Sequence, residues 1–181
     1  MTLNYSVSAE DHLQYQLFNA SKSKRIKAQR RSTWLFSTFV ILIIALLSFF
    51  NDHEQLGYSF IVAAIVFFCF FQKYNSYYYR RHYQKFVQDL PKSNFDQTVT
   101  VVFNPQTIET FDKSAELKIN LSEFEEFNEI GHYIYLKTQA GTSLIVPKLK
   151  LENQEIVISE LKALADRLHI NYTTELNWKW K

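Results

Sequence analysis

Four carboxylates between Glu123 and Glu129 are the side chains of this sequence best placed to do chemistry. Acidic residues at such spacing could bind a divalent cation or act as paired carboxylates in acid–base catalysis. If the stretch is a strand, alternation puts Glu123, Glu125 and Glu129 on one face. The stretch lacks the Asp/Asn-Gly turn of a calcium loop, so we interpret it as a solvated face.

The other reactive side chains form no known catalytic or metal-binding pattern. The three glycines, at positions 57, 131 and 141, cannot make a phosphate-binding loop, and no GxSxG, HExxH or CxxC motif occurs. The five histidines have no partners at ligand spacing, and the single cysteine, Cys69, lies in an apolar run. We therefore expect no enzyme activity, no cofactor and no metal site.

Two further sets of side chains are weaker candidates for ligand contact. Lys148 follows Pro147 at the end of a predicted strand, and Lys150 lies close behind it. In the tail NWKWK, Trp178 and Trp180 alternate with lysines, a combination that suits the headgroup region of a membrane. The tail either returns to the bilayer, forms a last strand or ends the chain as a disordered segment.

Two uncharged apolar runs are long enough to anchor these candidate residues at a membrane. The first, Ser32–Asn51, covers about 30 Å as a helix, and the second, Gln55–Gln72, covers about 27 Å. Both are apolar on all faces, unlike an amphipathic surface helix. Apart from the thiol of Cys69 they carry no ionisable side chain, which favours an anchor over an ion path, and no GxxxG motif specifies a dimer. We predict a transmembrane hairpin of unspecified oligomeric state.

Basic residues flank the predicted hairpin on one side only. The connection NDHE has no Lys or Arg, whereas ten basic residues lie outside the two runs between Ser21 and Lys85. Excess Lys and Arg marks the cytoplasmic side, so we expect both termini in the cytoplasm. The residues expected to fix this topology and to contact anionic headgroups are Lys22, Lys24, Arg25, Lys27, Arg30, Arg31, Lys73, Arg80, Arg81 and Lys85.

The segment SKSKRIKAQRRS, taken alone, could also bind nucleic acid through its phosphates. Because it adjoins an apolar span, anionic headgroups are always within reach, and we predict a lipid contact and no nucleic-acid partner. Ser8 and Asp11 have the spacing of a capping box at the start of a helix. No Pro or Gly interrupts the chain from Ala9 to Phe50, or from Tyr74 to Leu90, so both helices are expected to extend into the cytoplasm.

The remainder of the chain predicts a small β-rich domain. Thr2–Val7 and the segments 96–103, 107–112, 115–121, 132–138 and 142–148 read as strands, with turns at 104–106 and at Gly141. Residues 123–129 fit a strand or a short helix. The apolar stripe of 153–168 predicts an amphipathic helix that covers the sheet.

These patterns together predict an α+β membrane protein: a two-helix transmembrane hairpin with long cytoplasmic helical extensions, and a small antiparallel β domain with a C-terminal helix. The expected parts are an N-terminal strand and basic amphipathic helix (1–31), a first transmembrane helix (32–51), a short non-cytoplasmic loop (52–54), a second transmembrane helix (55–73), a juxtamembrane helical stalk (74–91) and the β-rich domain (92–181).

The stretches NYSVSAEDHLQY and LSEFEEFNEIGHYIYLKTQAGTSLIVPKLKL, with the basic-flanked hairpin between them, resemble the YcxB-like membrane proteins of bacteria. The matching positions are Ser122 to Phe124, Glu129, Tyr133 to Leu136 and Val146 to Lys148, while Leu121 stands where that family often has Trp. The resemblance implies a protein of the bacterial inner membrane with a cytoplasmic domain of pleckstrin-homology-like type. It implies no reaction.

Three functions are compatible with these expectations. The first is a non-enzymatic membrane-anchored module whose domain binds a protein, a peptide or anionic lipid. The alternative is a membrane-embedded immunity or envelope-stress protection factor, in which the hairpin itself acts. The third, an enzyme at the membrane surface using residues such as Glu123, Glu126, His132 and Lys148, has the least support in the sequence.

Overall fold

The computed structural model describes residues 1–91, 95–112 and 116–181 and divides into two compact units. One unit contains residues 1–15 and 86–179, and the other contains residues 16–85 together with Trp180 and Lys181. The fold is α+β, with two long apolar helices in the second unit and two β-sheets in the first. Residues 92–94, where the β-rich domain was expected to begin, and Ala115, the start of one expected strand, lie outside the described residues.

The first sheet is antiparallel and has the order β1-β2-β3-β4. Its strands are β1 (Thr2–Ser6), β2 (Thr98–Phe103), β3 (Thr107–Phe111) and β4 (Glu116–Asn120). The strand expected at the N-terminus is confirmed: Leu3 and Tyr5 are buried while Thr2 and Asn4 are exposed, the alternation of a half-buried strand. Leu3 pairs with Val101, so the first residues of the chain are joined to a strand almost a hundred positions later.

The second sheet has the order β7-β6-β5-β8. Its strands are β5 (Phe124–Ile130), β6 (Tyr133–Thr138), β7 (Ser143–Pro147) and β8 (Asn171–Glu175). Residues 123–129 therefore form a strand preceded by a short 3-10 turn, Leu121–Glu123, and not a helix. The sequence did not predict β8, which runs parallel to β5 because α4 (Gln154–Leu168) carries the chain from β7, at one edge of the sheet, to the opposite edge. The other pairings of this sheet are antiparallel, as expected.

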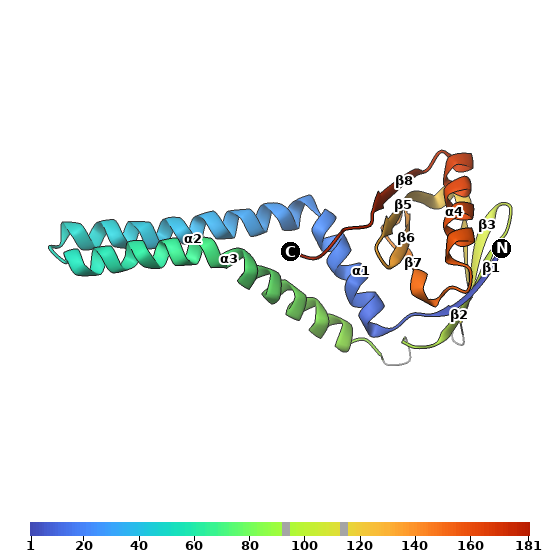
Figure 1. The fold of residues 1–181 in the computed structure, drawn as a ribbon, viewed down its shortest axis with the longest axis horizontal. Coiled ribbons are helices and arrows are strands. Elements are labelled where there is room, and N and C mark those ends of the chain that lie inside the picture. The colour runs from blue at the N-terminus through green and yellow to red at the C-terminus, as the bar shows by residue number, and fades with distance from the viewer. Residues whose placement is uncertain (92–94, 113–115) are drawn as a thin grey trace. The chain divides into compact units, whose positions relative to one another are not determined.

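Helix α4 lies beside both sheets and completes one hydrophobic core (Figure 1). It contributes Val157, Leu161 and Ala165, which are buried at helical spacing. The helix ends at His169, whose N–H donates to the carbonyls of Ala165 and Asp166. Its positive φ of 55° turns the chain so that the N–H of Ile170 reaches the Ala165 carbonyl at 2.9 Å. The largest fully buried side chains of the domain come from both sheets and from α4: Tyr135, Phe127, Ile108, Ile134, Leu136, Leu161, Val101 and Val146.

The other unit is built on a helical hairpin of α2 (Lys24–Phe50) and α3 (Glu54–Gln88), joined by a turn at residues 51–53 (Figure 1). Helix α1 (Ala9–Lys22) precedes it. We expected an unbroken helix from Ala9 to Phe50, but the chain changes direction at Ser23. The Ser23 side chain accepts a hydrogen bond of 3.3 Å from the N–H of Ile26 and so begins a new helix without Pro or Gly.

Candidate functional site

Helices α2 and α3 expose a continuous set of large apolar side chains, here called the apolar belt. In the most apolar windows of α2 and α3, only 6% and 17% of the residues are buried, at mean hydropathies of 2.3 and 1.8. By length and composition both helices can cross a membrane. The belt consists of Leu35, Phe36, Phe39, Val40, Leu42, Ile43, Ile44, Leu46, Leu47, Phe50, Leu56, Tyr58, Ile61, Val62, Ile65, Val66, Phe68 and Phe70.

Close aromatic contacts hold the two apolar helices together. The rings of Trp34 and Phe68 lie 4.4 Å apart between centroids. Near the turn, the Phe49 ring covers Gly57 so tightly that a Cβ at position 57 would lie 2.7 Å from two ring atoms. The same Phe49 ring meets Tyr58 edge-on at 5.2 Å. A larger side chain at position 57 would therefore require the Phe49 ring to move.

The ten basic residues expected to fix topology all lie in the helical unit, at the end of α1, at the start of α2 and in the part of α3 that follows its apolar run. All are exposed except Arg30, which is half-buried. The turn at the opposite end of the hairpin carries Asp52, and α3 begins with Glu54. The charge asymmetry in the sequence is thus an asymmetry between the two ends of the hairpin.

Arg30 is the centre of a cluster that joins α2, α3 and the end of the tail. Its guanidinium lies 5.0 Å from the Trp180 ring and 5.6 Å from the Tyr79 ring, as cation–π pairs. Arg30 Nη2 donates to the main-chain oxygen of Lys181 at 2.9 Å, and Trp180 Nε1 donates to the carbonyl of Ser76 at 2.9 Å. Desolvation lowers the pKa of the Arg30 guanidinium below its ordinary value. We call this the Arg30 cluster.

Lys148, a candidate ligand contact, is buried. Its ammonium lies 3.0 Å from Glu129 Oε1, while the other carboxylate oxygen accepts a hydrogen bond from Tyr172 Oη at 3.0 Å. Lys162 stands 3.5 Å from the same oxygen. Burial raises the pKa of the Glu129 carboxyl, but these donors and cations more than offset it, so the pKa lies below its usual value. The pair ties β5 to the end of β7.

Lys150, the second candidate lysine, holds the start of α1. Its ammonium lies 2.7 Å from Asp11 Oδ2 and donates to the carbonyl of Ser6 at 3.0 Å. Asp11 also accepts from the Tyr133 hydroxyl at 2.9 Å and from the N–H of Ser8 at 2.7 Å. The N–H of Asp11 donates to Ser8 Oγ at 3.3 Å, so the predicted capping box is confirmed.

The four carboxylates of residues 123–129 do not converge. Glu123 lies in the 3-10 turn, and the pairing of β5 with β6 shifts register between Phe124 and Glu126. Glu125 consequently faces solvent and pairs with Lys137 at 2.9 Å, whereas Glu129 is buried. The expectation that Glu123, Glu125 and Glu129 share one face was wrong, because the bulge interrupts the alternation. Among the described residues, no three His, Cys, Asp or Glu side chains could hold a metal ion.

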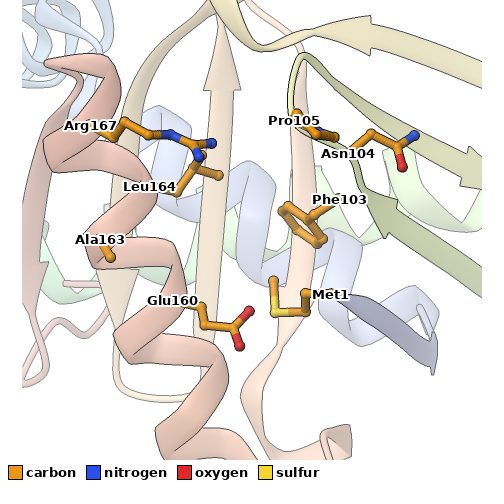
Figure 2. A pocket seen from close by; sticks show the side chains of 8 residues that line it. All are labelled: Met1, Phe103, Asn104, Pro105, Glu160, Ala163, Leu164 and Arg167. Atoms are coloured by element: carbon orange, nitrogen blue, oxygen red, sulfur yellow. The ribbon is translucent and has the colours of Figure 1, made fainter.

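A pocket of about 440 Å³ lies between α4 and the ends of β1 and β2. Figure 2 shows Glu160, Ala163, Leu164 and Arg167 on the α4 side, and Met1, Phe103, Asn104 and Pro105 on the other. Its size falls in the range of about 300–1,000 Å³ typical of ligand sites. Sequence reasoning missed it, although the α4 residues recur at i, i+3, i+4 and i+7, the spacing of one helix face.

The two tail tryptophans are both half-buried but belong to different units. Trp178 follows β8, and its main-chain N–H donates to the carbonyl of Glu175 at 2.9 Å. Trp180 belongs to the Arg30 cluster. The candidate contacts therefore divide into basic and aromatic groups beside the apolar belt and paired lysines within the β domain. Comparison with known protein families, curated proteins and solved structures finds no match to this chain.

Proposed function

We propose that this protein is a non-enzymatic integral protein of the bacterial cytoplasmic membrane. Helices α2 and α3 cross the bilayer, both termini lie in the cytoplasm, and a small β domain is presented there to a protein or peptide ligand. The observation that carries the proposal is the apolar belt with exposed basic residues at one end only. An exposed apolar surface of this extent favours a lipid environment, and the positive end favours the cytoplasmic face.

The β domain supports the binding role through its architecture. Two sheets with a helix after the last antiparallel strand are compatible with a pleckstrin-homology-like domain, as the resemblance to the YcxB-like family also implies. Its two most buried lysine–carboxylate contacts are structural. Lys148 with Glu129 joins the end of β7 to β5, and Lys150 with Asp11 holds the start of α1. The cavity beside α4 supplies a place for a ligand.

The proposal is tested by crosslinking in intact cells followed by co-purification of the full chain. We expect a specific partner whose recovery depends on the β domain, because the hairpin alone offers only an anchor. The comparison is with a chain truncated after Pro91. Equal recovery with and without residues 92–181 would count against the binding role, and would favour a function of the hairpin itself.

A further inference from the structure

Helix α4 presents two different faces. Val157, Leu161 and Ala165 enter the core, while Glu160, Ala163, Leu164 and Arg167 line the pocket. Glu160 and Arg167 are seven residues apart, or about 10 Å along the helix axis. Figure 2 shows both side chains extending from α4 toward the side formed by Met1 and Phe103. The pocket thus has a charge at each end and an apolar centre.

Both charged side chains are exposed on α4. Within residues 1–91, 95–112 and 116–181, neither Glu160 nor Arg167 has an ion-pair partner. Between them Ala163, Leu164 and Phe103 form an apolar floor. Burial of this floor under a ligand would contribute favourable free energy to binding. A ligand that covers this floor is best matched if it brings a positive group to Glu160 and a negative group to Arg167.

This charge arrangement discriminates between ligand classes. An anionic lipid headgroup would gain from Arg167 but would be repelled by Glu160, since like charges across an interface are costly. A polypeptide can carry both signs at a defined spacing. In a polyproline II segment, residues three apart lie on the same face and are about 9 Å apart, close to the separation of the two charges on α4. Such segments dock in grooves lined by aromatic side chains, and Phe103 supplies one.

We propose that the pocket beside α4 binds an extended peptide segment of a partner protein, with a basic and an acidic residue three positions apart and apolar residues between them. The inference rests on the proposed function, since it names the ligand class of the β domain. Glu160 receives the basic side chain, Arg167 receives the acidic one, and the intervening apolar side chains cover Ala163, Leu164 and Phe103.

The test uses the full chain in detergent micelles and four labelled peptides with the central sequences Lys-Pro-Leu-Glu, Glu-Pro-Leu-Glu, Lys-Pro-Leu-Lys and Ser-Pro-Leu-Ser, measured by fluorescence anisotropy. The wild type should prefer Lys-Pro-Leu-Glu by about tenfold. Glu160→Lys should shift the preference to Glu-Pro-Leu-Glu, and Arg167→Glu to Lys-Pro-Leu-Lys. Asp166→Lys, an exposed change on the same helix outside the pocket, should keep the wild-type order.

The proposal is overturned if the wild type binds all four peptides equally or not at all, if the acidic pair binds it best, or if the charge reversals leave the preference unchanged. A second arm places the photocrosslinker p-benzoylphenylalanine at Ala163 or at the exposed Ser122 in intact cells. A crosslink at Ala163 that Arg167→Glu abolishes supports the pocket. A crosslink at Ser122 alone overturns the pocket and leaves the proposed function standing, whereas no crosslink at either position contradicts both.

Discussion

The ammonium of Lys148 lies 3.0 Å from Glu129 Oε1, and the two side chains expose only 3% and 5% of their surface. Removing one member of a buried pair costs roughly 3–5 kcal/mol, and without Lys148 the Glu129 carboxylate would keep only the Tyr172 hydroxyl and the half-exposed Lys162 as partners. We therefore predict that Lys148→Met lowers the free energy of unfolding by about that amount, measured by urea denaturation of the full chain in detergent.

Lys137→Met is the matched control for that substitution. Lys137 pairs with Glu125 at 2.9 Å, but both side chains are substantially exposed, at 36% and 53%. An exposed pair contributes about 1 kcal/mol or less, so the control should remain near the wild type. Equal destabilisation by the two substitutions would mean that the Glu129–Lys148 pair has no special structural role.

Asp11 makes the stability of the β domain depend on pH. Burial raises the pKa of its carboxyl, but the hydrogen bonds from Lys150, Ser8 and Tyr133 outweigh burial, so the pKa lies below the ordinary value. A carboxyl with a depressed folded-state pKa stabilises the fold above its unfolded pKa of about 3.9, and this stability is lost as the pH falls through the folded pKa.

We accordingly predict a free energy of unfolding that falls below about pH 4, since Glu129 has a pKa shift of the same sign. His12, whose pKa is lowered by burial, adds a decline that begins as the pH falls below its ordinary value of about 6.5. Asp11→Asn should lower stability at pH 7 and flatten the decline at acid pH, as measured by urea midpoints. Asp166→Asn, exposed on α4, serves as the control. An acid decline of the same steepness in Asp11→Asn would remove Asp11 from the explanation.

Gly57 should tolerate no larger side chain while Phe49 keeps its position. A Cβ there would lie 2.7 Å from two atoms of the Phe49 ring, which also packs on Tyr58. Overpacking of this kind costs about 1–3 kcal/mol, so Gly57→Ala should lower the thermal midpoint in detergent. Because the clash is with Phe49, the same change in a Phe49→Ala chain should cost much less. Additive effects of the two substitutions would contradict the packing.

Arg30→Ala should release the end of the tail. Arg30 contacts the Trp180 and Tyr79 rings and the main-chain oxygen of Lys181, and cation–π contacts at such sites contribute about 0.5–1 kcal/mol each. We expect faster trimming by carboxypeptidase and a red shift of tryptophan emission. Lys27→Ala, an exposed charge on the same helix, should change neither. Identical behaviour of the two variants would argue against the Arg30 cluster.

Local patterns in the sequence predicted most elements of the fold. Alternation identified β1 through Leu3 and Tyr5, and the apolar stripe with Leu161 and Ala165 identified α4. The sequence did not predict β8, because Asn171–Glu175 is a short polar segment whose pairing with β5 depends on where α4 returns the chain. The sequence did not predict the break at Ser23 either. A serine can cap a helix or lie inside one, so unlike Pro or Gly it does not mark a helix end by itself.

The sites were less predictable than the elements, because burial is a property of the whole fold. Nothing local in Pro147-Lys148 shows that Glu129, on another strand, lies opposite the ammonium. The bulge after Phe124 reverses which carboxylates face solvent, and alternation cannot show it. The pocket joins Met1 and Phe103 to Arg167, positions far apart in the chain.

In the proposed topology, α2 and α3 span a membrane and the β domain lies on the cytoplasmic side. The most direct measurement is labelling of single cysteines by a membrane-impermeant maleimide in intact cells, in a chain with Cys69→Ser. His53→Cys, in the turn, should be labelled from outside, while Ser122→Cys, in the β domain, should be labelled only after permeabilisation. Labelling of Ser122→Cys in intact cells, with His53→Cys protected, would contradict this topology.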